Sequence, residues 1–253
     1  MINIILNGYL GQMGMVVTSL VDKKTDMSIV AGIDTAVSRG QPQFPTFNNI
    51  FDCDMPADCI IDFSVSSVVG QVVDYARAKK IPAIICTTGL DDDTNDKITE
   101  ASKNTAIFKS ANMSLGINLI ANMLSRVSKT LYEEGFDIEI IDKHHNRKID
   151  APSGTAFLLA DTVNASVGNL EYVFDRSSTR EKRGRNEIGL HSIRAGTLVG
   201  QHSVIFMGQD EMIEFSHEAF SKEVFAVGAL KAAKYIIGKP PGLYNMGHIM
   251  EEL

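Results

Sequence analysis

The residues best suited to chemistry lie close together, in the segment DKHHNRKIDAPSGT at positions 142–155. Two adjacent histidines, His144 and His145, are followed by Lys148. Histidine titrates near neutral pH, so either ring can give up a proton there. A lysine adds a mobile positive charge that suits a carboxylate. These residue types favour hydride transfer to a C=N or C=O group, in which the developing negative charge must meet an acid or a cation.

The end of the same segment predicts an anion site at the start of a helix. Pro152 keeps the residue before it out of the helical conformation, and Ser153 is suited to cap a helix that begins with Gly154 and Thr155. Backbone N–H groups and a hydroxyl there can bind one carboxylate. Two other interpretations stay open, a solvated basic loop and a metal site. We predict no metal, because neighbouring histidines on an extended segment point apart and no cysteine or spaced carboxylate completes a ligand set.

The first half of the chain alternates strand-like and helical patterns. This alternation predicts βαβ units and a parallel sheet covered by helices on both faces. The expected strands are residues 2–6, 28–33, 59–63, 83–86 and 105–109, and the expected helices are 13–23, 65–80 and 91–102.

The pattern changes in the second half. Three consecutive strand candidates with short connections indicate antiparallel pairing, and therefore an α+β second domain with a mainly antiparallel sheet. The expected strands are residues 136–142, 189–194, 201–207 and 212–217, and the expected helices are 117–131, 155–166 and 224–237. The fold class is thus α/β with a second, α+β domain.

A glycine-rich turn follows the first expected strand. Gly8, Gly11 and Gly14 fit the spacing G-x-x-G-x-x-G, a variant of the dinucleotide-binding fingerprint, between a strand and a helix. Asp34 ends the second strand, about 20 residues after the glycine turn. In dinucleotide-binding proteins a carboxylate at this separation binds the ribose hydroxyls. The simpler alternative is that the glycine spacing arises by chance and that Asp34 is an ordinary turn residue. Taken together, the two features predict a nicotinamide dinucleotide.

The residue after Asp34 bears on the choice between NADH and NADPH. It is Thr35, so no base stands beside the carboxylate to neutralise a 2′-phosphate. We therefore expect NADH to serve at least as well as NADPH. Arg39 would weaken this expectation if its loop folded back.

Two further segments lie at expected strand ends on the edge of the sheet where ligands bind. Their hydroxyl and backbone groups suit contacts with the nicotinamide and its ribose, although ordinary connecting loops would look the same. These segments are Cys86, Thr87 and Thr88, and Ser110, Ala111, Asn112 and Met113.

Composition limits the class of protein. The chain has 253 residues with 44% hydrophobic and 22% charged residues, as expected of a globular protein. Its net charge of −7 disfavours nucleic-acid binding. Three irregularly spaced cysteines indicate reduced thiols, and the first residues form neither a signal peptide nor a membrane span, so we expect a cytoplasmic protein without membrane contact.

The motifs together resemble the 4-hydroxy-tetrahydrodipicolinate reductase family, also called dihydrodipicolinate reductase. The central match is H-H-x-x-K followed by D-A-P-S-G-T-A, which is long and unusual. Other matching segments follow in order along the chain: the glycine loop at 8–14, TTG at 87–89, ANMS at 111–114, HSIRAG at 191–196 and PGLY at 241–244.

The resemblance implies a Rossmann domain at residues 1–115 and 226–253, and an inserted domain at 116–225 that binds substrate and builds a homotetramer. It implies reduction of the cyclic dicarboxylate 4-hydroxy-tetrahydrodipicolinate to tetrahydrodipicolinate by NADH or NADPH, in the diaminopimelate and lysine branch. A nicotinamide-binding regulator without chemistry, or a reductase of another imine or carbonyl acid, would share the fold.

Site residues carry over position by position. His144 is then the proton donor and Lys148 the second acid or charge stabiliser. The substrate carboxylates are bound by His145, Gly154 and Thr155. The cofactor is lined by Gly8, Tyr9, Leu10, Gly11, Gln12, Met13, Asp34, Cys86, Thr87, Thr88, Ser110, Ala111, Asn112 and Met113. The sequence departs from the family pattern at Cys86, where glycine is usual, and at Thr35, where NADPH-binding members carry arginine.

Overall fold

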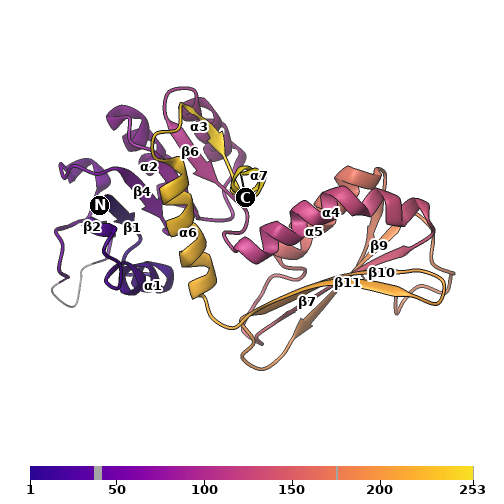
Figure 1. The fold of residues 1–253 in the computed structure, drawn as a ribbon. Helices are drawn as coiled ribbons and strands as arrows, with labels where there is room; N and C mark the ends of the chain where they lie inside the picture. Colours follow the sequence, from indigo (N-terminus) through magenta and orange to yellow (C-terminus); the bar gives the residue numbers. More distant parts are fainter. Residues whose placement is uncertain (37–41, 175, 253) are drawn as a thin grey trace. The chain divides into compact units, whose positions relative to one another are not determined.

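The computed structural model describes residues 1–36, 42–174 and 176–252. Its chain forms two compact units, Met1–Ser114 with Lys222–Leu253, and Leu115–Ser221 (Figure 1). The second boundary falls at 221/222 and not at 225/226. The reason is that α6 (Glu223–Ile236) begins there and packs into the core of the first unit.

The first unit is built around a parallel sheet. Its strand order is β3-β2-β1-β4-β5-β6-β12, and every strand pair among the described residues is parallel. This is the doubly wound dinucleotide-binding order, with β1 and β4 at the point where the order reverses, and the expected Rossmann-type sheet is confirmed. The strands are β1 (Ile2–Asn7), β2 (Met27–Ile33), β3 (Thr46–Phe47), β4 (Cys59–Asp62), β5 (Ala83–Ile85), β6 (Ala106–Lys109) and β12 (Gly242–Tyr244).

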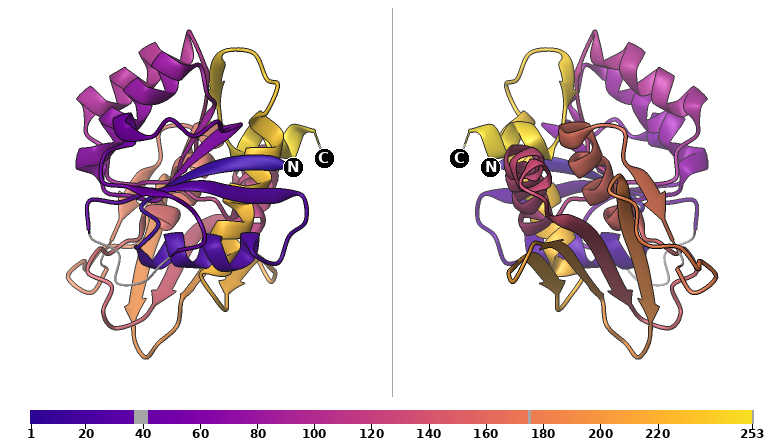
Figure 2. Two further views of the ribbon diagram at one scale, coloured as in Figure 1. Left: turned by 90° about the vertical axis from the view of Figure 1, so that its left-hand side faces the viewer. Right: turned by 90° about the vertical axis from the view of Figure 1, so that its right-hand side faces the viewer.

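Helices cover both faces of this sheet (Figure 2). Successive side chains of a strand point to opposite faces. Ile4 and Leu6 of β1 therefore pack into one buried cluster with α1 (Gln12–Val21) and α6, while Ile5 packs into the other cluster with α2 (Ser66–Lys79) and α3 (Asp92–Ser102). The short elements η1 (Ile50–Asp52) and α7 (Met246–Glu251) complete the unit.

The second unit contains a mixed sheet, which corrects the expectation of a mainly antiparallel one. Its order is β11-β10-β7-β9-β8. The pairs β10–β11 and β7–β10 are antiparallel, but β7–β9 and β8–β9 are parallel. Its strands are β7 (Asp137–His144), β8 (Glu171–Val173), β9 (Glu187–Arg194), β10 (Gly200–Met207) and β11 (Met212–Ala219). The chain passes from β7 through helix α5 before it reaches β9, and such a crossover joins parallel strands.

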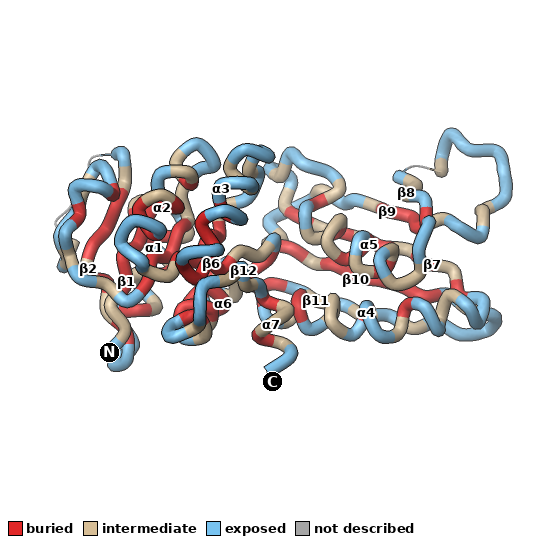
Figure 3. Tube along the Cα trace, turned by 90° about the horizontal axis from the view of Figure 1, so that it is seen from above, coloured by how far each residue is buried: buried red, intermediate tan, exposed pale blue. Residues whose placement is uncertain are grey.

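Two helices, α4 (Leu115–Glu133) and α5 (Gly154–Val167), lie side by side on one face of this sheet (Figure 1). The core lies between them and the inward side chains of the strands, such as Ile138, Ile140 and Val204. Buried segments run along the strands in Figure 3, while the outer faces of the helices are exposed. None of the described helices combines the length and apolar character needed to cross a membrane.

Candidate cofactor and active sites

The glycine loop between β1 and α1 has a backbone path that side chains would obstruct. Gly8 has φ +79°, and a Cβ there would lie 2.5 Å from the carbonyl oxygen of Phe63. A Cβ at Gly14 would lie 2.2 Å from the carbonyl oxygen of Gly8. Gly11 is the N-cap of α1 and has no side-chain capping hydrogen bond. The first turn of α1 thus presents backbone N–H groups and the positive end of its dipole to an anion such as a pyrophosphate.

We expect Gly14→Ala to weaken NADH binding at least tenfold and to lower the free energy of unfolding by about 1–3 kcal/mol, because backbone must shift to admit the methyl group. NADH fluorescence titration and thermal unfolding measure the two effects. Gly70→Ala in α2 is the matched control: its Cβ would meet nothing closer than 3.5 Å, so its NADH affinity should stay unchanged. Equal NADH affinity in both variants would contradict this account of the loop.

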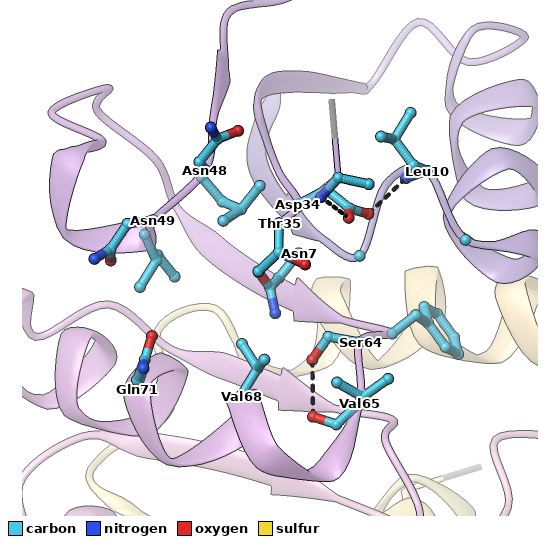
Figure 4. A pocket seen from close by; sticks show the side chains of 16 residues that line it. Asn7, Leu10, Asp34, Thr35, Asn48, Asn49, Ser64, Val65, Val68 and Gln71 are labelled. Carbon is cyan, nitrogen blue, oxygen red and sulfur yellow. Dashed lines mark hydrogen bonds between the residues drawn. The ribbon is translucent and has the colours of Figure 1, made fainter. Parts of the chain in front are cut away.

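A cavity of about 430 Å³ opens beside this loop (Figure 4). Asp34 lies in its wall directly after β2, and its carboxylate accepts hydrogen bonds from the backbone N–H groups of Leu10 (3.1 Å) and Ala36 (3.0 Å). The aspartate is therefore fixed to the glycine loop, with remaining lone pairs available to ribose hydroxyls. The lining and the glycine loop fit a dinucleotide. The cavity is lined by Asn7, Gly8, Leu10, Gly11, Ile33, Asp34, Thr35, Ala36, Asn48, Asn49, Ile50, Phe63, Ser64, Val65, Val68 and Gln71.

Other residues expected to line the cofactor are placed differently. Tyr9, Cys86 and Met113 are buried in the core cluster of α1 and α6. Burial raises the pKa of the Cys86 thiol well above its usual value, so this thiol stays protonated. Gln12 and Met13 belong to the first turn of α1, beyond the cavity lining.

Three polar residues of the two strand-end segments make hydrogen bonds within the first unit. The Thr87 hydroxyl donates to the buried carboxylate of Asp62 at 2.6 Å. The Asn112 side chain accepts from the N–H of Ser114 at 2.7 Å, and the Ser110 hydroxyl donates to the carbonyl of Asn112. Thr88 and Ala111 lie in the same connecting loops, outside the cavity lining.

Two parts of the cavity wall were not predicted from the sequence, and one of them is the segment at residues 48–50. The loop after β4 and the first turns of α2 contribute Phe63, Ser64, Val65, Val68 and Gln71. A usable signal was present, because this loop follows a strand at the same edge of the parallel sheet as the glycine loop.

The second unit holds the residues suited to acid chemistry. His144 ends β7 and is 8% exposed, and its Nδ1 lies 2.8 Å from Oδ2 of Asp142, which is fully buried. Oδ2 also accepts from Nη1 of Arg194 at 2.8 Å, and Oδ1 accepts from the Ser192 hydroxyl at 2.6 Å. Although burial acts to raise it, these hydrogen bonds hold the pKa of Asp142 well below its usual value. Asp142 is therefore a permanent anion beside the His144 ring.

Asp142, His144 and His202 also offer ligand atoms within 4.8 Å of one another, a cluster that the sequence did not suggest. The guanidinium of Arg194 already contacts the carboxylate oxygen that faces His144. A metal ion at this position would meet that fixed positive charge, so the geometry favours an ion pair and a proton here.

Lys148 is brought back beside the strand end by a turn. Its backbone N–H donates to the carbonyl of His145, and the N–H of His145 donates to the carbonyl of Leu198. The Lys148 ammonium lies 2.8 Å from Oδ1 of Asp150, and its side chain is 22% exposed. Although partial burial acts to raise it, the hydrogen bond from Lys148 lowers the pKa of Asp150.

The start of α5 has the expected cap. The Ser153 hydroxyl oxygen accepts from the N–H of Ala156 at 3.2 Å. Gly154 is exposed, and a Cβ there would meet no atom within 4 Å. Thr155 follows in the first turn and is half-buried. His202 of β10 connects this turn to the acid: its Nε2 lies 2.9 Å from the Ser153 hydroxyl, and its ring centroid is 5.0 Å from that of His144.

Comparisons with known families identify the family of the chain. Models of the N-terminal and C-terminal parts of dihydrodipicolinate reductase match residues 2–113 and 116–250. The chain belongs to this family. The resemblance inferred from the motifs is thereby confirmed, and with it the assignment to a family of pyridine-nucleotide-dependent reductases.

Individual relatives extend over almost the whole chain. The 4-hydroxy-tetrahydrodipicolinate reductase of Clostridium tetani is 49% identical over 247 residues, which cover 97% of this chain and 96% of the relative. That of Caldanaerobacter subterraneus subsp. tengcongensis is 46% identical and covers 100% and 99%. The dipicolinate-bound dihydrodipicolinate reductase of Paenisporosarcina sp. TG-14 shares the fold, with a TM-score of 0.82, 21% identity and coverage of 98% and 99%.

Proposed function

We propose that this protein reduces 4-hydroxy-tetrahydrodipicolinate to tetrahydrodipicolinate with a nicotinamide cofactor, in the diaminopimelate and lysine branch. The observation that carries the proposal is the pairing of His144 with the buried, ionised Asp142 in a unit that also presents a capped helix start to an anion. A regulator that only senses the cofactor has no use for such an acid. Family membership supplies the identity of the substrate.

The residues divide the reaction between them. The bound cofactor supplies the hydride. Asp142 engages Nδ1 of His144, so Nε2 is the atom left to give a proton to the substrate. A Cβ at Gly200 would lie 3.0 Å from this Nε2, and the glycine thus keeps space beside it. Lys148 offsets negative charge on the substrate. His145, Gly154 and Thr155 bind the carboxylates of the substrate.

The direct test is a coupled assay that generates the cyclic substrate in situ and follows the oxidation of NADH and NADPH in parallel. We expect oxidation that depends on the cyclic substrate. A protein that binds NADH but oxidises neither cofactor in this assay would be a sensor and would contradict the proposal.

For the cofactor, we expect NADH to support a kcat/KM at least equal to that of NADPH. Asp34 repels a 2′-phosphate, and Thr35 beside it carries no charge. Arg39 lies outside the described residues. Thr35→Arg should raise kcat/KM for NADPH about 10- to 100-fold, because one charge-assisted hydrogen bond is worth about 1.5–3 kcal/mol, and leave kcat/KM for NADH within about twofold. A hundredfold preference of the unmodified protein for NADPH would refute this prediction.

We also propose that the second unit, expected at residues 116–225 and found at Leu115–Ser221, binds substrate and builds a homotetramer, and that the protein is cytoplasmic. The assembly is supported by the second sheet. Its face opposite α4 and α5 carries exposed apolar side chains, among them Ile193, Met207 and Met212. Sedimentation equilibrium tests the assembly. The location is supported by the three cysteines, which are all free and buried, as suits a reducing compartment.

A further inference from the structure

A row of four polar side chains crosses the sheet of the second unit beneath the proposed site. Strand register places Ser192 of β9 opposite Asp142 of β7, Asp142 opposite His202 of β10, and His202 opposite His217 of β11. Asp142 and His202 are 0% and 5% exposed. Buried polar groups are expensive unless they make defined hydrogen bonds, so these two residues call for an explanation beyond packing.

We propose that Asp142 and His202 are positioning residues with separate tasks, Asp142 for the proton donor and His202 for the carboxylate-binding turn. This inference rests on the function proposed above. Beyond that function, we infer that Asp142 and His202 affect different steps of the reaction.

Asp142 orients His144. Its Oδ2 receives both Nδ1 of His144 and Nη1 of Arg194 at 2.8 Å, and Arg194 also donates from Nη2 to the carbonyl of Asp150 at 2.6 Å. The carboxylate is thus held from two sides by Arg194 and Ser192, and cannot follow the ring if the ring turns. A fixed acceptor at Nδ1 sets the tautomer and the direction of Nε2.

His202 orients Ser153. The Ser153 oxygen already accepts from the N–H of Ala156, and Nε2 of His202 lies 2.9 Å away. Nδ1 of His202 is buried without a hydrogen-bond partner among the described atoms. An orphaned buried N–H is rarer than an orphaned acceptor, so the proton belongs on Nε2 and is donated to Ser153. The serine hydroxyl is then left to donate its own hydrogen toward an anion at the helix start.

The charge state of His202 fits this task. Burial, with the neighbouring charge of His144 as a further cause, lowers its pKa to about 3. His202 therefore stays neutral across the physiological range. It can orient a hydroxyl without adding a positive charge that would compete with the proton donor for Asp142.

The two tasks predict opposite kinetic signatures. Asp142→Asn should lower kcat about 100-fold or more, as expected when the ring of a catalytic histidine takes the wrong tautomer, and leave the Kd for dipicolinate within about twofold. His202→Leu should raise KM for the substrate and Kd for dipicolinate about tenfold, the loss of one buried hydrogen bond, and leave kcat within about threefold. His202→Gln retains an N–H donor and should recover most of the affinity.

Isothermal titration with dipicolinate gives the affinity independently of turnover, and NADH titration with thermal unfolding verifies that each variant is folded. If both variants lose kcat and affinity alike while they remain folded, the row is merely structural and the inference fails. It also fails if His202→Gln is no better than His202→Leu. If instead the unmodified protein neither binds dipicolinate nor turns over the cyclic substrate, the proposed function itself is wrong.

Discussion

His144→Gln is expected to lower kcat about 10²- to 10⁴-fold, the usual contribution of a positioned general acid, with KM changed less than about threefold. Glutamine can still donate a hydrogen bond to Asp142, so the packing of the strand end is retained. It cannot release a proton near neutral pH. The loss therefore falls on the transition state and not on substrate binding. Steady-state kinetics with saturating NADH measure both constants.

The chain offers a matched control on the same strands. His191 of β9 lies with its Nε2 2.7 Å from Oε2 of Glu139 of β7, a second histidine–carboxylate pair in this sheet. Because strand side chains alternate, this pair occupies the face opposite His144. His191→Gln should keep kcat within about twofold. Comparable losses in the two variants would show that the effect comes from the sheet and not from an acid at position 144.

Most strands and helices of the first unit could be predicted from the sequence because they are defined by local residue patterns. Runs such as residues 2–6 and 83–86 are apolar enough to be seen as buried strands. The strands β3 and β12 were not predicted, because two or three residues contain no periodicity. The parallel pairing of β7 with β9 was also missed. It follows from the crossover through α5, whereas the short links between strand candidates had pointed to antiparallel pairing.

In the candidate site, too, local features could be predicted from the sequence and features set by tertiary packing could not. His144, Lys148 and Ser153 stand in one segment, so a motif could reveal them. Their partners Arg194 and His202 come from other strands, and register across a sheet is set by tertiary packing and not by neighbouring residues. Asp142 was expected to end its strand, so its pairing with His144 became evident only when the structure extended β7 to His144.

Lys148→Ala is expected to lower kcat/KM about 10²- to 10³-fold, the range for removing one preorganised electrostatic contact in an active site. Unlike the change at His144, it should act on both constants. The ammonium attracts a carboxylate in the ground state and also meets charge that develops during hydride transfer. Its side chain is only 22% exposed and is held by Asp150 at 2.8 Å, so its position is already set and solvent screens it incompletely.

The neighbouring Arg147 provides the control, because it is exposed and carries the same charge. Arg147→Ala removes one positive charge from the same turn, so a long-range attraction of the dianionic substrate would be reduced equally in both variants and would disappear at high salt. A direct contact between Lys148 and the substrate would persist at high salt. We therefore expect Arg147→Ala to keep kcat/KM within about twofold. The Lys148→Ala defect should persist at about 0.5 M salt, roughly five times the ionic strength at which the screening length is about 10 Å. A defect that salt abolishes would reduce Lys148 to a contributor to the surface potential.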